Sequence, residues 1–190
     1  MVEVKNVYKK YADKQVLENV SMVFKQGITS IMGASGRGKT TLAYIMAGLV
    51  KPDSGEVLGQ KKISFMFQED RLLEWESALS NVLFVKDTPL FSKKYIDKAT
   101  YLLNQAELNE SIFTKAYELS GGMKRRVSLC RALIADFDLL ILDEPFKGLD
   151  ENLKYKIMDM VKEHTDGKTV ICITHDINEA KYLGGEIIDF

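Results

Sequence analysis

The stretch of sequence that decides the fold reads Gly33-Ala34-Ser35-Gly36-Arg37-Gly38-Lys39-Thr40. It fits the pattern G-x-x-x-x-G-K-[ST], in which glycines let several backbone N–H groups point at one bound phosphate. In such a loop the lysine reaches the outer phosphates and the final hydroxyl faces Mg²⁺. An apolar run over 28–32 precedes the loop, and a helical pattern over 39–49 follows it. This strand–loop–helix order is the one that phosphate binding requires, because it places the positive end of a helix at the phosphates.

Working outward, short apolar segments that fit strands alternate with helical segments. Two early strands, one through Val2 and Val4 and one over 16–24, are expected to be joined by a polar turn, and a second turn is expected at Pro52-Asp53-Ser54-Gly55. Further strands are expected at 28–32, 63–67, 139–142, 169–174 and from 187, with an amphipathic helix over 151–164. Buried strands alternating with helices indicate an α/β fold whose mainly parallel sheet is covered on both faces. The pattern from about 73 to 135 is helical and interrupts this alternation.

Composition and charge exclude several classes of protein. The 190 residues are 46% hydrophobic and 28% charged, which excludes disorder, collagen and a disulfide-rich scaffold. Lysine and arginine total 26 against 27 acids, so binding of nucleic acid through bulk charge is not expected. A local basic patch remains compatible with that balance.

The cysteines and the apolar runs bear on the cellular compartment. Cys130 and Cys172 each lie in an apolar stretch without metal-type spacing, so we expect two buried free thiols in a reducing compartment. The N-terminal residues do not form a signal peptide, and no apolar run approaches the roughly 20 residues that cross a bilayer. Any membrane role is therefore expected to be peripheral.

Two acids, Asp143 and Glu144, follow the apolar strand 139–142. Ligands of open α/β sheets bind at the carboxyl ends of the strands. Asp143 is suited to hold Mg²⁺ through water, and Glu144 is suited to polarise a water for attack on a γ-phosphate. The alternative is that both acids cap the next turn. The phosphate-binding loop at residues 33–40, called the P-loop below, disfavours this interpretation.

A second glycine-rich segment, Leu119-Ser120-Gly121-Gly122-Met123, precedes a long helical pattern. Ser120 fits an N-cap, and a helix start with a hydroxyl and bare N–H groups can bind an anion. On its own, the segment fits a plain capped helix equally well.

These motifs, in this order, resemble the ATP-binding cassette ATPases, the nucleotide-binding subunits of ABC transporters. The resemblance covers nearly the whole chain and implies one domain over 1–190. Its fold would be α/β, a P-loop NTPase core with a mainly parallel sheet, a small N-terminal antiparallel β part and an inserted helical subdomain at roughly 73–136. It also implies ATP and Mg²⁺ as cofactors. Two copies would sandwich two ATP molecules head to tail, each site using the P-loop of one chain and the Ser120 segment of the other.

The resemblance further implies individual site residues. The catalytic set is Glu144, His175 and Gln68, and the metal set is Thr40, Gln68 and Asp143. The nucleotide-binding set comprises Tyr11, Gly33, Ala34, Ser35, Gly36, Arg37, Gly38, Lys39, Thr40, Thr41, Ser120, Gly121, Gly122 and Asp150. Tyr11 would stack on adenine and His175 would contact the γ-phosphate. The alternatives are an ordinary strand-end tyrosine and a structural histidine. Met123 departs from the family's usual glutamine, and Arg37 adds a cation to the loop.

The segment Gln68–Trp75 narrows the resemblance to importer ATPases for nitrate, sulfonate and taurine or for thiamine-precursor pyrimidines. In that family this region borders the groove that receives the membrane subunit's coupling helix. Leu73 and Trp75 would therefore be part of that contact, and the alternative is that Trp75 packs in the core. The cluster Lys124-Arg125-Arg126 fits a solvated helix face better than a contact to lipid or a partner.

The function that this resemblance implies is an ATPase subunit of a bacterial-type importer of a small solute. It would lie on the cytoplasmic face of the cell membrane and form a homodimer in the ATP state. Its partners would be integral membrane permease subunits and a separate solute-binding protein, and it would not bind nucleic acid. An exporter ATPase and a non-transport ABC ATPase are the alternatives. A small-molecule P-loop kinase is disfavoured, because it needs neither the Leu119–Gly122 segment nor His175.

Overall fold

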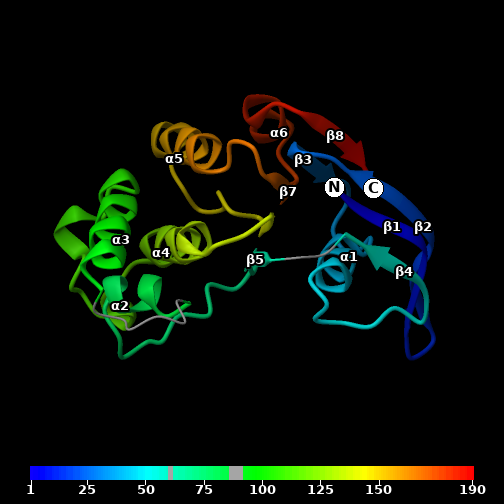
Figure 1. Ribbon diagram of the computed structural model, residues 1–190, viewed down its shortest axis with the longest axis horizontal. Coiled ribbons are helices and arrows are strands. Elements are labelled where there is room, and N and C mark those ends of the chain that lie inside the picture. The colour runs from blue at the N-terminus through cyan, green and yellow to red at the C-terminus, as the bar shows by residue number, and fades with distance from the viewer. Residues whose placement is uncertain (60–61, 86–91) are drawn as a thin grey trace. The chain divides into compact units, whose positions relative to one another are not determined.

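The computed structural model describes residues 1–59, 62–85 and 92–190, which divide into two compact units. The first unit comprises Met1–Phe65, Phe137–Glu144 and Thr165–Phe190, and the second comprises Met66–Asp136 and Pro145–His164. Figure 1 labels the helices α1–α6 and most of the strands of both units. Across the described ranges, no helix is both long and apolar enough to cross a membrane.

The first unit is built on a five-stranded sheet in the order β5-β6-β7-β3-β8. Its strands are β3 (Gly27–Met32), β5 (Ile63–Met66), β6 (Leu139–Asp143), β7 (Thr169–Ile173) and β8 (Glu186–Asp189). β3 pairs in parallel with β7 and β8, and β6 pairs in parallel with β7. Every residue of β6 and β7 is buried, as the apolar runs predicted for strands covered on both faces. The expected parallel sheet is confirmed.

A smaller antiparallel sheet lies in the same unit, in the order β2-β1-β4. It consists of β1 (Val2–Tyr11), β2 (Lys14–Phe24) and β4 (Ser54–Leu58). Its buried face, with Val4 and Phe24, joins helix α1 (Lys39–Met46) and strands β6 and β7 in one hydrophobic cluster. The small antiparallel part expected from the family resemblance is confirmed.

Two local expectations need correction, and one helix was missed. The turn predicted at 52–55 ends earlier, because Ser54 and Gly55 already belong to β4. Gly55 fits there because a Cβ would lie 2.3 Å from the carbonyl oxygen of Asn6 on the neighbouring strand. The helix predicted to Leu49 ends at Met46, just before Gly48 with φ +72°. Helix α6 (Ile177–Leu183) was not predicted at all.

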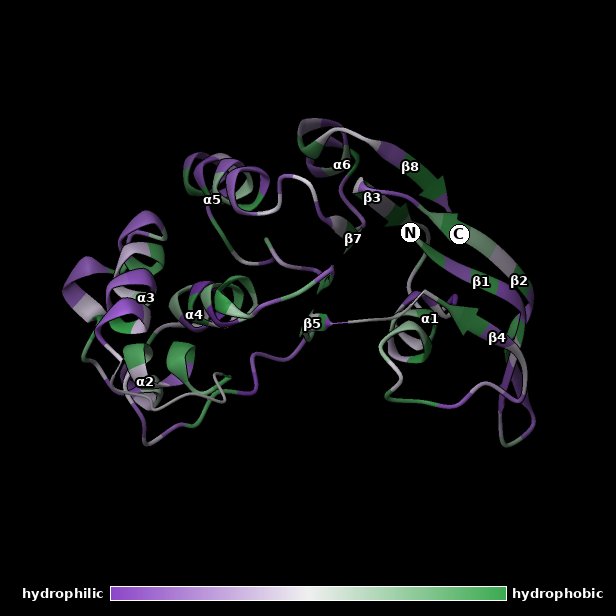
Figure 2. Ribbon diagram, viewed as in Figure 1, coloured by the Kyte–Doolittle hydropathy of each residue, from purple (hydrophilic) through white to green (hydrophobic). Residues whose placement is uncertain are grey.

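The second unit is helical over most of its length. It contains α2 (Ala78–Leu83), α3 (Lys93–Gln105), α4 (Gly121–Ile134) and α5 (Glu151–His164), with short 3₁₀ helices η1 (Asn109–Ser111) and η2 (Ala116–Glu118). Helices α2 and α3 both pack on α4. Figure 2 shows hydrophilic and hydrophobic residues mixed along α3 and α5, as expected of helices that bury one face. Residues 86–91, which fall within the expected helical subdomain of 73–136, lie outside the described residues.

Candidate nucleotide site

The P-loop connects the carboxyl end of β3 to the start of α1, in the first unit. Gly33, Gly36 and Gly38 all have positive φ, at +136°, +79° and +99°. A Cβ at Gly33 would lie 2.3 Å from the carbonyl oxygen of Phe190, and one at Gly38 would lie 2.8 Å from that of Val16. Both the backbone conformation and the available space therefore require glycine at these two positions.

Lys39 is the first residue of α1, and its ammonium is held by the loop itself. Nζ donates to the carbonyl oxygens of Gly33 and Ala34, each at 2.8 Å. The ammonium group thus already donates hydrogen bonds to two carbonyl oxygens. A phosphate bound in the loop would compete with these carbonyls for the Lys39 ammonium.

Thr40 and Asp143 meet where α1 begins and β6 ends. The Thr40 hydroxyl donates to Asp143 Oδ2 at 2.8 Å, and Asp143 is only 1% exposed. A hydroxyl that gives its proton to a carboxylate still offers its oxygen lone pairs, so the pair presents hard oxygen ligands side by side. This donor set fits Mg²⁺, which binds in proteins through oxygen ligands and one or two carboxylates.

Glu144 follows Asp143 with a left-handed backbone, at φ +50°. Its N–H donates to the carbonyl oxygen of Ile173 at 2.9 Å, which ties the turn after β6 to the end of β7. A glutamate in this conformation is uncommon, and strained backbone of this kind clusters at functional sites. The fold thus holds a carboxylate at the carboxyl edge of the sheet in a conformation it would not adopt by default.

His175 lies beside Glu144, just beyond the end of β7. Its Nδ1 is 3.6 Å from Glu144 Oε1, and its side chain is 69% exposed, against 22% for Glu144. The preceding Thr174 is fixed by a hydrogen bond from its hydroxyl to Glu179 Oε2 at 2.5 Å, inside α6. The first unit therefore brings together Lys39, Thr40, Asp143, Glu144 and His175 at the sheet edge that the sequence predicted.

Tyr11 ends β1 in the same unit and is 46% exposed. The ammonium of Lys9 lies over its ring, 5.4 Å from the centroid. A partly exposed ring can stack on a base, as the resemblance implies.

The remaining predicted residues lie in the second unit. Gln68 is exposed two residues after β5, and Ser120 caps α4 by accepting a hydrogen bond from the N–H of Met123 at 3.3 Å. Gly121 and Gly122 form the first turn of that helix. Asp150 accepts a hydrogen bond from the N–H of Leu153 at 3.0 Å, at the start of α5. The predicted N-cap at Ser120 is confirmed.

Comparisons with known proteins agree with this geometry. Residues 17–147 match the sequence family described as ABC transporter. The chain is 36% identical to the aliphatic sulfonates import ATP-binding protein SsuB of Corynebacterium glutamicum, over 97% of this chain and 78% of that protein. It is 40% identical to the taurine import ATP-binding protein TauB of Roseobacter denitrificans, over 92% of this chain and 69% of that protein. The chain belongs to the ABC transporter family.

A solved ABC cassette provides the structural counterpart. The chain superposes with a TM-score of 0.91 and 34% identity on an ATP-binding cassette solved as a dimer in a post-hydrolysis state with ADP and Pi. The match covers 100% of this chain and 94% of that one. The expected ABC ATPase fold is thereby confirmed.

Sequence reasoning missed the role of Arg125 in this cassette. The solvated-face interpretation of Lys124-Arg125-Arg126 is wrong for Arg125, which is 4% exposed. Its Nη1 donates to the carbonyl oxygens of Phe67 and Gln68, at 2.9 and 2.8 Å, and to Asp70 Oδ1 at 3.0 Å. The helix that begins at Ser120 thus holds the backbone of the Gln68 segment. The sequence did offer a signal, because Arg125 lies on the same face of α4 as the apolar residues Leu129 and Ala132.

Asn81 is a second missed residue, and it shapes the segment that follows. It is fully buried, and its amide donates to the carbonyl oxygens of Leu73, Glu76 and Ser77 while its oxygen accepts from the N–H of Leu73. The loop so fixed presents Trp75, which is 68% exposed. The core interpretation of Trp75 is therefore wrong.

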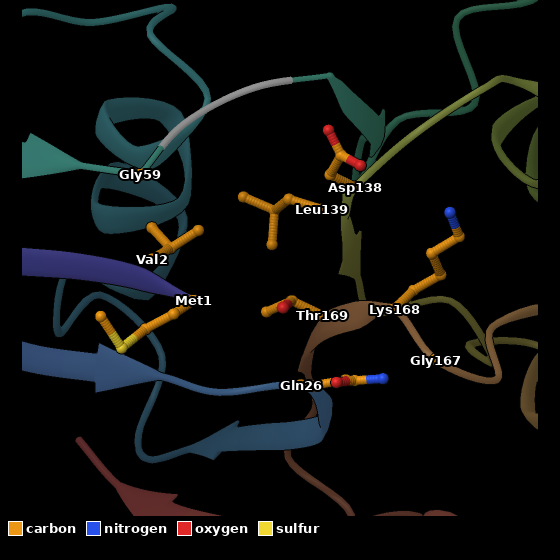
Figure 3. Close-up of a pocket in the computed structure, with 9 residues that line it drawn as sticks. All are labelled: Met1, Val2, Gln26, Gly59, Asp138, Leu139, Gly167, Lys168 and Thr169. Carbon is orange, nitrogen blue, oxygen red and sulfur yellow. The ribbon is translucent and has the colours of Figure 1, made fainter.

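A cavity of about 290 Å³ lies at the opposite edge of the parallel sheet. Leu139 and Thr169, the first residues of β6 and β7, line it together with Val2. In Figure 3 these three side chains point toward its centre, whereas the ammonium of Lys168 points away. Since the P-loop, Thr40 and Asp143 lie at the other edge of the sheet, this cavity is separate from the candidate nucleotide site.

The two cysteines are buried free thiols, as predicted. Burial raises the pKa of Cys130 to about 12 and also raises the pKa of Cys172. Both thiols stay protonated at neutral pH and are unsuited to act as nucleophiles or metal ligands.

The contacts of Arg125 yield a stability prediction. Replacing Arg125 with methionine leaves Asp70 and two carbonyls without their buried donor, so the free energy of unfolding should fall by about 3 kcal/mol. Urea denaturation measures the change. The matched control is Lys124→Ala, which removes only the exposed pair with Glu74 at 3.0 Å and should cost under about 1 kcal/mol. Equal losses in both variants would contradict the structural role of Arg125.

Proposed function

We propose that this chain is the ATP-hydrolysing, nucleotide-binding subunit of an ABC importer. The observation that carries the proposal is the convergence of the P-loop, the Thr40–Asp143 pair and the Glu144–His175 pair at one sheet edge. A phosphate-binding loop beside a carboxylate that can polarise water is what ATP hydrolysis requires. The similar proteins SsuB and TauB are import ATP-binding proteins, which favours an importer over an exporter or a non-transport cassette.

Binding of ATP uses groups that the fold already orients. The backbone N–H groups of residues 33–41 and the positive end of α1 would hold the phosphates, and Lys39 would exchange its two carbonyl partners for phosphate oxygens. Tyr11 would stack on the adenine. Arg37, exposed in the loop, adds positive charge beside the phosphates.

The metal set would be Thr40 and Asp143, with Gln68 as a third residue. Mg²⁺, when bound, neutralises charge on the β- and γ-phosphates. Thr40 and Asp143 already lie in hydrogen-bond contact, so little rearrangement of the protein accompanies binding there.

Hydrolysis assigns separate tasks to Glu144 and His175. Glu144 accepts a proton from water as that water attacks the γ-phosphorus in line, and the bond to the β-phosphate oxygen breaks to leave ADP. The exposed ring of His175, held near Glu144, donates to a γ-phosphate oxygen. Charge that develops on the transferring group therefore meets fixed donors.

The rest of the chemistry requires two chains. Ser120, Gly121 and Gly122 would bind the γ-phosphate held by the opposite copy, and Asp150 would link the two sites. The solved cassette with ADP and Pi is dimeric, which supports a reaction that requires two chains. In this proposal residues 1–190 act as one cassette, with a helical subdomain at roughly 73–136.

The membrane partner completes the proposal. A homodimer on the cytoplasmic face of the membrane would bind integral permease subunits, and a separate solute-binding protein would deliver the solute. The names of SsuB and TauB point to a small organic sulfonate as the first solute class to assay.

Replacing Lys39 with alanine tests the P-loop assignment. The variant loses the cation that attracts the outer phosphates, so ATP affinity should fall by at least about tenfold in calorimetric titration. Lys51→Ala, which alters an exposed lysine shortly after α1, is the matched control and should bind normally. Unchanged affinity in Lys39→Ala would remove the central support of the proposal.

Replacing Glu144 with glutamine separates binding from turnover. The variant should bind ATP, release phosphate about 100-fold more slowly or worse, and accumulate an ATP-bound dimer in size-exclusion chromatography, because the amide cannot accept the proton from water. Glu186→Gln, an exposed acid on β8, serves as the control. Hydrolysis at the wild-type rate would show that another group activates the water.

Purification of the tagged protein from host membranes in mild detergent tests the hypothesis that the chain is a subunit of a transporter. Polytopic membrane subunits should co-purify, and the resulting complex in proteoliposomes should hydrolyse ATP faster when a sulfonate-loaded binding protein is added. Recovery of soluble partners alone, such as ribosomal or repair proteins, would instead support a non-transport cassette.

A further inference from the structure

Asp53, in the turn between α1 and β4, holds the end of strand β1 through three contacts. Its Oδ1 accepts from Lys9 Nζ at 2.8 Å, and its Oδ2 accepts from the N–H of Lys10 at 2.6 Å. Its own N–H donates to the carbonyl oxygen of Tyr8 at 2.9 Å. One residue therefore fixes the backbone that leads into Tyr11.

The strand needs this support because its pairing is irregular at the same place. The register of β1 on β2 shifts between Val7 and Lys9 and again between Lys9 and Lys10. The register of β1 on β4 shifts between Lys5 and Tyr8. An irregular register locally disrupts the ladder and bends the strand, so contacts from outside the sheet such as those of Asp53 help to fix its course.

Lys9 transmits the position of Asp53 to the ring of Tyr11. The side chain of Lys9 is only 14% exposed, and its ammonium lies over the Tyr11 ring at 5.4 Å from the centroid. The hydrogen bonds from Lys9 and Lys10 also lower the pKa of Asp53, so the carboxylate that holds the ammonium is charged at neutral pH. A cation on one face of a ring leaves the other face for a stacking partner.

We infer that Asp53 is a positioning residue for the nucleotide base, which acts through Lys9 to hold Tyr11 with one ring face covered and the other open to a purine. The inference rests on the proposed function, in which Tyr11 stacks on adenine. Asp53 and Lys9 bear on the base and not on the phosphates, so their effect should vanish for a ligand that has no base.

The test compares ATP with inorganic tripolyphosphate, each with Mg²⁺, in calorimetric titrations of the full chain. Asp53→Ala leaves the Tyr11 ring in place and should remove only part of the base–aromatic stacking, so it should weaken ATP binding about three- to tenfold. Binding of tripolyphosphate should not change. In a Tyr11→Ala background, the added Asp53→Ala substitution should have no further effect, because Asp53 acts through that ring.

Lys9 variants and a matched ion pair provide the controls. Lys9→Met should reproduce the loss of ATP affinity, and Lys9→Arg, which keeps a cation over the ring, should restore it. Glu3→Ala removes another ion pair of β1, with Lys5 at 3.4 Å, and should leave both affinities unchanged.

The outcomes separate this inference from the proposed function. Equal weakening of ATP and tripolyphosphate in Asp53→Ala, or a loss that persists without Tyr11, would overturn the positioning role. A silent Asp53→Ala beside a weakened Tyr11→Ala would overturn the inference alone. A silent Tyr11→Ala would remove both the stacking role and the inference, while the Lys39 and Glu144 predictions would stand.

Discussion

The register of three parallel strands is the constraint on which the candidate site depends. Ile31 of β3 pairs with Ile173 of β7, and Ile173 also pairs with Asp143 of β6. Since the strands end at one level, the residues that follow them meet at one sheet edge. The N–H groups of Glu144 and Thr174 extend the pairing, by donating to Ile173 and Ile31. A slip of one residue would turn every side chain of the strand to the opposite face and separate Asp143 from Thr40.

The polar side chains at this sheet edge differ in how far they are buried. Asp143 is almost fully buried, and its carboxylate accepts a hydrogen bond from the Thr40 hydroxyl. This bond matters because a buried polar group without a partner is costly. Glu144 and His175 are progressively more exposed. Polar groups thus change from fixed to accessible along one edge, which suits a metal held inside and a water that must enter. The left-handed backbone at Glu144 shows that the surrounding structure, and not local preference, determines this placement.

The parts that could be predicted from the sequence were local. The P-loop glycines and the apolar runs of β6 and β7 carry their structural cause within a few residues, so the parallel sheet and its functional edge followed from them. The burial of Arg125 could not be predicted, because the groups that accept its hydrogen bonds lie more than fifty residues away along the chain. The short helix α6, capped by Asp176, is too brief to show a clear period. The place of Trp75 was left open because tertiary packing decides whether a tryptophan is buried or exposed.

The distribution of cations explains how a chain of net charge −1 can recognise a polyanion. Lys39 is held by uncharged carbonyls, which a phosphate can displace, whereas Lys9 is held by the carboxylate of Asp53, which a phosphate would have to outcompete. Arg125 is committed still further, because its buried guanidinium donates to the carboxylate of Asp70 and to two carbonyls. The partners of each cation, and not the total charge, decide which one is available to a nucleotide. In the proposed function, this difference is the reason that Lys39 serves the phosphates whereas Lys9 serves the ring of Tyr11.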